Sequence, residues 1–130
     1  MAFIEWVPAL SVGVEEIDEQ HRRLFALVNE LSEAEGDEET GRALAALTSY
    51  AAEHFALEER LFAERRYPGA EEHVREHAAF AAKLRGFAAD YAAGGEGLER
   101  RLLDYLKASL TGHISFADRK YRPYLARRGE

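Results

Sequence analysis

The chain has 130 residues, of which 47% are hydrophobic and 32% charged, and its formal net charge is −7. This length and apolar content predict a single domain, 1–130, and the absence of cysteine excludes disulfides and thiolate metal sites. The acidic balance argues against nucleic-acid binding, which requires a basic surface. No apolar run approaches the roughly 18 residues that span a membrane, and no secretory signal is recognisable, so we expect a cytoplasmic protein without membrane partners.

The first 13 residues lack a helical pattern. They contain Trp6, Pro8 and Gly13 without the apolar spacing of three and four residues that marks an amphipathic helix. We therefore predict an extended N-terminal arm over 1–13, followed by a helical bundle over 14–126.

Apolar residues then recur at helical spacing in two segments, 17–31 and 44–62. Gly36 is expected to mark the end of the first helix, because glycine commonly follows a helix C-terminus. Asp37 is expected to cap the second helix, since its side chain can accept from a free backbone N–H group. The Tyr-Pro-Gly sequence at 67–69 is expected to break that helix.

Two further segments show the same spacing, 73–91 and 98 to about 121. The glycine pair at 94–95 separates them, and Pro123 is expected to limit the last helix. Segments of about 18–26 residues would be roughly 27–39 Å long as helices. Because the connections are short, successive helices should alternate in direction. The predicted fold is an all-α, antiparallel up-down-up-down four-helix bundle.

The five histidines are distributed over all four predicted helices, and each continues the apolar stripe that should face the core. Taken singly, each is more simply a hydrogen-bonded core residue. Taken together, five buried imidazoles and two nearby carboxylates would be costly in so small a domain without a cation. We therefore predict a metal site. Its candidate ligands are His21, His54, Glu58, His73, His77, His113 and Asp118.

The composition of this set restricts the metal. Seven ligands exceed the three or four of a typical zinc site, and calcium or magnesium would require mainly oxygen ligands. Two transition ions bridged by two carboxylates would use the whole set, and iron suits imidazole and carboxylate ligands. The Glu-x-x-His pairs of ferritin-like di-iron proteins are absent. An imidazole-rich set favours ferrous iron, which points towards dioxygen binding rather than substrate oxidation.

His113 and Asp118 are five residues apart, and in a regular helix their side chains would not point to the same side. Five residues correspond to about 140° of rotation, so the two side chains would diverge. Both can face one site only if the helix widens locally, and Gly112 makes such a distortion easier. We predict a π-bulge between His113 and Asp118.

The chain resembles the bacterial hemerythrins over almost its full length. The resemblance lies in three blocks, LSVGVEEIDEQHRRLFALVNEL, HFALEERLFAERRYPGAEEHVREHAAF and HISFADRKYRPYL. It implies two non-haem iron ions joined by an oxo or hydroxo bridge. By this resemblance one iron is bound by three histidines, the other by two, and two carboxylates bridge them. His73, His77 and His113 would bind the first iron, and His21 and His54 the second. Glu58 and Asp118 would be the bridging carboxylates.

The resemblance also implies an apolar pocket beside the iron that has only two histidines, where dioxygen would bind. Its lining would be Leu24, Phe55, Leu110 and Ile114, and Tyr121 matches a tyrosine near a bridging carboxylate. The chain departs from the family at Ser109, where hemerythrins usually have tryptophan. Either Ser109 opens the pocket to water and anions, or a neighbouring ring such as Trp6 or Phe116 refills the space.

The implied function is reversible dioxygen binding for storage, delivery or scavenging, by a monomer that is not an enzyme. Two alternatives use the same centre. One is a di-iron peroxidase or oxidase, with access through Ser109, and the other is an oxygen or redox sensor acting through a separate protein partner. Buffering of iron is a third.

Overall fold

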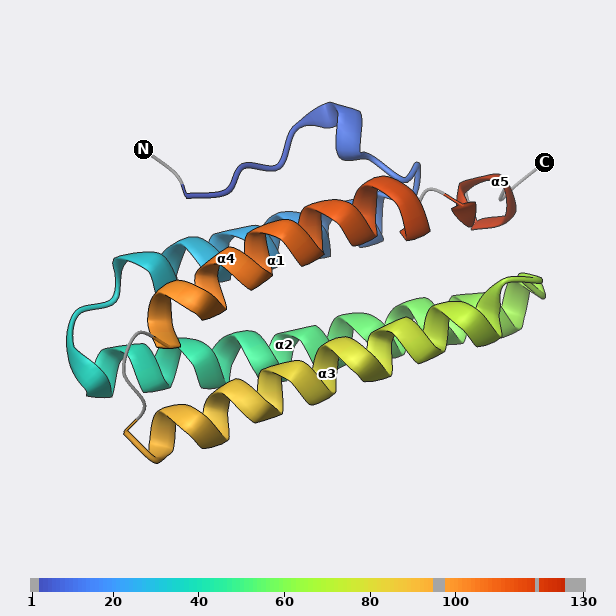
Figure 1. Cartoon of the computed structure of the whole chain (residues 1–130). Coiled ribbons are helices and arrows are strands. Elements are labelled where there is room, and N and C mark those ends of the chain that lie inside the picture. Colours follow the sequence, from blue (N-terminus) through green and yellow to red (C-terminus); the bar gives the residue numbers. More distant parts are fainter. Residues whose placement is uncertain (1–2, 95–97, 119, 126–130) are drawn as a thin grey trace.

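The computed structural model describes residues 3–94, 98–118 and 120–125, and its regular structure there is helical (Figure 1). Four long helices lie side by side and alternate in direction: α1 (Glu15–Glu33), α2 (Gly36–Arg65), α3 (Ala70–Ala92) and α4 (Leu98–Gly112). The predicted all-α four-helix bundle is thus confirmed. None of the helices in these ranges has the length and apolar character needed to cross a bilayer.

The connection between α1 and α2 differs from the prediction. Gly36 is the first residue of α2, with a φ of +85°, and Asp37 lies in the first turn instead of capping it. The capping position is Glu35, whose side chain makes no capping hydrogen bond. Because the left-handed φ of Gly36 turns the chain directly into the new helix, the connection is shorter than predicted. At 30 residues, α2 also exceeds the expected length.

The predicted break at 67–69 is present and places an aromatic ring in the core. Arg66 ends α2 in the left-handed conformation, with φ 54° and ψ 48°. The Tyr67 ring then folds back so closely that a Cβ atom on Gly69 would lie 2.8 Å from it. A side chain at position 69 would force the ring to shift from the position in which Tyr67 is buried against Phe62.

The last helix ends earlier than predicted. After α4, a π-helical segment η2 (His113–Asp118) precedes a short helix α5 (Arg122–Leu125). Tyr121 therefore lies between two elements instead of ending one helix. Pro123 does not limit a helix but occupies the first turn of α5, where a missing N–H group costs little.

The N-terminal arm is less extended than predicted, because Pro8–Leu10 form a 3-10 helix, η1. The arm lies along α1 and α4 (Figure 1). The Asn29 side chain of α1 pairs with the backbone of Ile4, accepting from its N–H and donating to its C=O, both at 2.9 Å. Buried Asp18 accepts from the backbone N–H of Val12 at 2.9 Å and from the Ser11 hydroxyl. These side chains attach the arm to α1.

Replacing Asn29 with alanine should weaken this attachment. Asn29→Ala removes both hydrogen bonds to Ile4 and is expected to lower the free energy of unfolding by about 1–2 kcal/mol. Urea denaturation and protease cleavage of the arm measure this effect, with Glu30→Ala on the exposed side of α1 as the control. Equal stabilities for the two variants would show that the arm is held by apolar packing alone.

Two apolar clusters fill the interior. The larger includes Leu24 and Phe55, and the smaller contains Phe62, Tyr67 and Tyr121. Along α2, Phe55 belongs to the first cluster and Phe62 to the second, with Glu58 between them. The candidate ligands thus lie in a polar layer between two apolar clusters, which cover it on two sides.

Candidate metal centre

The seven predicted ligands come together inside the bundle. His21 comes from α1, His54 and Glu58 from α2, His73 and His77 from α3, and His113 and Asp118 from η2. Six of them are buried, whereas the His113 side chain is 19% exposed. Helical spacing explains the pairs on α2 and α3, since residues four apart lie on one side of a helix.

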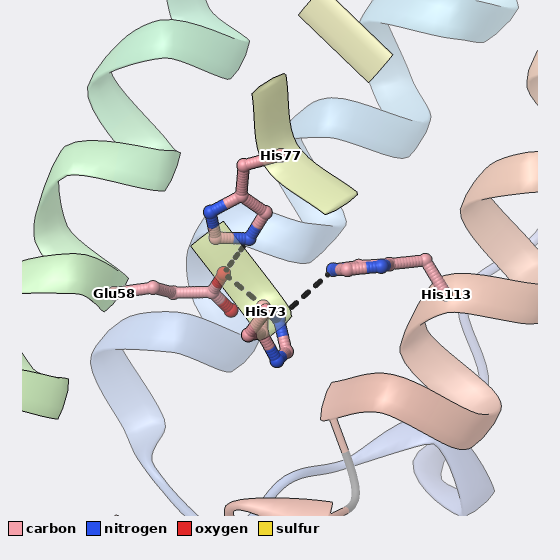
Figure 2. Close-up of side chains that lie close together, drawn as sticks. All are labelled: Glu58, His73, His77 and His113. Carbon is pink, nitrogen blue, oxygen red and sulfur yellow. Dashed lines mark hydrogen bonds and ion pairs between the residues drawn. The ribbon is translucent and has the colours of Figure 1, made fainter. Parts of the chain in front are cut away.

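The ligand atoms form two groups, within each of which they lie no more than 4.8 Å apart. Figure 2 shows the first, Glu58, His73, His77 and His113, with the imidazoles directed towards one another and towards the carboxylate. The second is His21, His54, Glu58 and Asp118. Each group is able to bind a metal ion, and Glu58 belongs to both.

Asp118 also links the two groups. Its Oδ1 lies 2.8 Å from His73 Nε2 and 2.9 Å from His113 Nε2, while its Oδ2 lies 3.1 Å from His21 Nε2. Two carboxylates therefore lie between three histidines on one side and two on the other. The resemblance to hemerythrins implies two irons bridged by these carboxylates, and this bridging stays a prediction.

The polar atoms in this layer fit a cation better than they fit one another. His21 Nε2, His77 Nε2, Glu58 Oε1 and both Asp118 oxygens are buried without a geometrically acceptable hydrogen-bond partner, although several lie about 3 Å from another ligand atom. Within the layer, His73 Nε2 and His113 Nε2 pair at 3.1 Å, but the atoms named above have no such partner. Buried polar atoms left unsatisfied are costly, and a metal ion would satisfy them. The residues present therefore fit a metal centre.

Three histidines are oriented by hydrogen bonds on their outer sides. Gln20 Oε1 lies 2.7 Å from His54 Nδ1, Glu59 Oε2 lies 2.9 Å from His77 Nδ1, and Glu76 Oε1 lies 3.2 Å from His113 Nδ1. When Nδ1 donates to these oxygens, Nε2 is left as the unprotonated atom that faces the site. The sequence prediction missed these partners. The one feature of the sequence that could have identified them is their position, because each directly precedes or follows a predicted ligand.

The carboxylates and histidines of the layer change one another's proton affinity. Burial tends to lower the pKa of His21, but close contact with Asp118 and Glu58 outweighs it and raises that pKa to about 9. Burial tends to raise the pKa of Glu58, but the charge of His54 and contacts with His21 and His77 lower it well below its usual range. Without metal, the carboxylates are therefore ionised and hold a proton on His21.

Tyr121 stabilises the shared carboxylate. Its fully buried hydroxyl donates to Glu58 Oε2 at 2.6 Å, and burial together with the Glu58 charge raises its pKa well above 10. The hydroxyl thus stays protonated and keeps one oxygen of Glu58 in place. The sequence resemblance predicted a tyrosine beside a bridging carboxylate, and Tyr121 contacts Glu58.

Tyr121→Phe keeps the packed ring and removes only this donor. We expect a loss of about 1–3 kcal/mol in the free energy of unfolding, because a buried carboxylate oxygen loses its partner. Chemical denaturation of the metal-free and metal-loaded forms measures it, and Tyr124→Phe, at an exposed position of α5, is the control. A stability equal to that of the parent chain would mean that the hydrogen bond contributes nothing to holding Glu58.

The predicted π-bulge is confirmed, since His113–Asp118 form a π-helical segment. The wider turn brings His113 and Asp118 to the same side of the chain, where Asp118 Oδ1 and His113 Nε2 are 2.9 Å apart. Such segments often occur at functional sites. Here the distortion allows two residues five positions apart, His113 and Asp118, to be candidate ligands of the same site.

A cavity of about 390 Å³ adjoins the layer. All five predicted pocket residues line it: Leu24, Phe55, Ser109, Leu110 and Ile114. Its edge reaches solvent, since Glu76 and Lys120 there are exposed. Trp6 does not belong to the lining but packs on the main cluster, with the Arg22 guanidinium 4.8 Å from its ring. The alternative residue, Phe116, lies outside the side chains that the structure describes.

Four antiparallel helices holding five histidines and two carboxylates in linked groups define a helical-bundle protein with a cation-binding interior. The chain matches the family model described as the hemerythrin HHE cation binding domain over residues 12–125. The chain therefore belongs to the hemerythrin family.

Individual proteins show the same relationship. The chain is 32% identical to a bacteriohemerythrin from Stenotrophomonas maltophilia (strain R551-3) over 93% of its own length and 80% of that protein. It is 30% identical to a myohemerythrin from Riftia pachyptila over 90% of its length and 89% of the relative. A crystal structure of wild-type hemerythrin superposes with a TM-score of 0.89, at 26% identity, over 96% of this chain and 99% of that one.

Proposed function

We propose that this chain is a non-haem di-iron protein that binds dioxygen reversibly, in storage, delivery or scavenging. Membership of the hemerythrin family supports it, as do relatives named bacteriohemerythrin and myohemerythrin. The observation that carries it is the layer of seven ligand residues, which divide into two linked groups and include buried atoms of His21, His77, Glu58 and Asp118 without hydrogen-bond partners. The cytoplasmic location, the monomeric state and the single domain over 1–130 stay predictions.

In this proposal His73, His77 and His113 hold one iron, and His21 and His54 hold the other, with Glu58 and Asp118 shared between them. A pair of ferrous ions held there would supply the two electrons that dioxygen takes up on binding and would regain them when dioxygen leaves. A group with two histidines and two shared carboxylates leaves room for an external ligand, and the cavity adjoins both His21 and His54.

The surrounding side chains orient ligands and exclude water. Gln20 and Glu59 fix the rings of His54 and His77, and Tyr121 holds Glu58. The buried side chains of Leu24 and Ile114 give the inner cavity an apolar wall. An apolar wall disfavours the entry of charged species. It therefore favours the binding and release of dioxygen over the catalytic oxidation of a substrate.

Metal analysis combined with optical spectroscopy tests the proposal. Reduced protein should contain two irons per chain, colour on exposure to air and return to the colourless form under vacuum. Irreversible oxidation in air, or a purified chain that binds no iron when supplied with it, would contradict the proposal.

A second candidate function is favoured by one observation, the cavity that Ser109 lines and whose edge reaches solvent at Glu76 and Lys120. It would give hydrogen peroxide access to the same centre, as in a peroxidase. Steady consumption of peroxide with a reductant, slowed by Ser109→Trp, would support this function. Peroxide consumption no faster than that of free iron would exclude it.

A further inference from the structure

The cavity is much larger than dioxygen requires. An engineered apolar cavity of about 150 Å³ already holds benzene, and this cavity measures about 390 Å³, including the space beside the candidate ligands that metal ions would fill. Its inner end is bounded by candidate ligands such as His21 and His54 and belongs to the metal centre. Phe80 on α3 and Tyr105 and Ser109 on α4 lie about one to two helical turns from His77 and His113, and we call the part of the cavity that they line the outer part. The outer part is the space that the proposed function leaves unused.

One wall of this cavity is a row of aromatic rings that leads from the outer part to the metal centre. Tyr105 and Phe80 stack with ring centroids 5.8 Å apart, and Phe80 meets Phe55 edge to face at 5.8 Å. Phe55 in turn stacks on His77, a candidate ligand, at 3.9 Å. Aromatic rings prefer offset-stacked or edge-to-face neighbours, so this wall suits a flat ring better than an aliphatic chain.

The polar groups of the outer part indicate an uncharged ligand with one hydroxyl. Ser109 places a hydroxyl on an otherwise apolar wall, and it can both donate and accept. Exposed Glu76 and exposed Lys120 offset each other at the edge of the cavity, and the net charge of −7 disfavours an anion. Any ion would also lose hydration against the aromatic wall.

We propose that the outer part of this cavity binds a small uncharged aromatic alcohol, of the size of phenol, beside the candidate metal centre. The ring lies against Phe80 and Tyr105, and the hydroxyl pairs with Ser109. The site is separate from the inner end assigned to dioxygen, so this inference goes beyond the proposed function.

Titration calorimetry of the oxidised, iron-loaded protein with phenol tests the inference. We expect saturable binding to one site, with benzoate and cyclohexanol each weaker by about tenfold or more, since the first is charged and the second lacks a flat ring. Ser109→Trp should fill the outer cavity and weaken phenol binding by at least about tenfold. Thr111→Trp, on the exposed side of the same helix, is the matched control and should leave phenol binding unchanged.

A conservative variant keeps the test independent of folding. Ser109→Ala retains the volume and loses the hydroxyl, so phenol should bind several-fold more weakly while toluene binds as before. Absence of saturable phenol binding, or equal weakening by Ser109→Trp and Thr111→Trp, would overturn the inference. A new visible absorption band on adding phenol would also overturn it, because that band would place phenolate on iron.

The same samples separate this inference from the proposed function. Reversible oxygenation is measured without phenol, and phenol binding is measured on the oxidised protein. Phenol binding without oxygenation would leave the site intact and contradict the carrier function. Oxygenation without phenol binding would support the carrier function and contradict the phenol site.

Discussion

Replacing Glu58 with glutamine should remove most of the bound metal. Glu58 is the residue common to both ligand groups, and it is fully buried. Glutamine keeps the shape but is neutral, so each group loses a negatively charged ligand. We expect at least about a hundredfold weaker metal binding, and less than one iron per chain where the parent binds two. At saturating metal, a hundredfold loss corresponds to about 2.7 kcal/mol of stability.

The measurement is metal analysis after dialysis, combined with denaturation in the presence and absence of a chelator. Glu53→Gln, at an exposed position on the same helix, is the matched control and should keep its metal. The chelated samples report any effect of the substitution on the metal-free chain itself. Full iron occupancy in Glu58→Gln would show that Glu58 does not bind metal.

Metal-free protein should lose stability as the pH rises from about 6.5 to about 9. The folded pKa of His21 is about 9 against an ordinary value of 6.5, because Asp118 and Glu58 outweigh the effect of burial. The pKa of His113 is raised in the same direction: burial opposes this, and contact with Asp118 outweighs it. Stabilisation by these protonated rings is complete below pH 6.5 and is lost as the folded groups release their protons. For His21 alone, the loss is about 2–4 kcal/mol.

Metal-loaded protein should show the opposite trend. Metal ions compete with the protons that these histidines hold, so apparent metal affinity should increase over the same pH range. Denaturation of chelated protein at several pH values, with parallel metal titrations, measures both trends. The prediction fails if the chelated protein becomes more stable between pH 6.5 and 9.

Below pH 4 a different loss is expected in the metal-free chain. The pKa of Asp118 is lowered: burial and the charge of Glu58 oppose this, but contacts with His113, His21 and His73 outweigh them. Its contribution to stability is therefore present above the usual carboxyl range and is lost as the pH falls through the lowered pKa. The metal-free chain should consequently be most stable between about pH 5 and 6.5.

The helical bundle followed from the sequence because it depends on local periodicity. Apolar residues at steps of three and four along each segment identify four amphipathic helices, and short connections allow few arrangements. The exact ends did not follow from these rules. The Gly36 turn and the end of α4 at Gly112 depend on how neighbouring helices meet, which local spacing does not describe.

The ligand set was likewise readable because each histidine continues an apolar stripe, and the His113–Asp118 spacing predicted its own distortion. The sequence did not identify the outer hydrogen-bond partners Gln20, Glu59 and Glu76. Many exposed polar side chains lie beside a ligand in sequence, and only the packing of helices shows which of them reaches an imidazole on another segment.

The sequence by itself determined the inventory of this protein: four helices, five inward histidines, two carboxylates and a serine at the pocket wall. Helical spacing reveals the helices and the inward histidines, whereas the resemblance to hemerythrins implied the place of the serine at the pocket wall. Only the tertiary structure decided how that inventory is used. It placed Glu58 and Asp118 between two sets of histidines and brought the Tyr121 hydroxyl within hydrogen-bond distance of Glu58. It also left an aromatic-walled space beside Ser109, because distances between helices depend on the packing of side chains far apart in the chain.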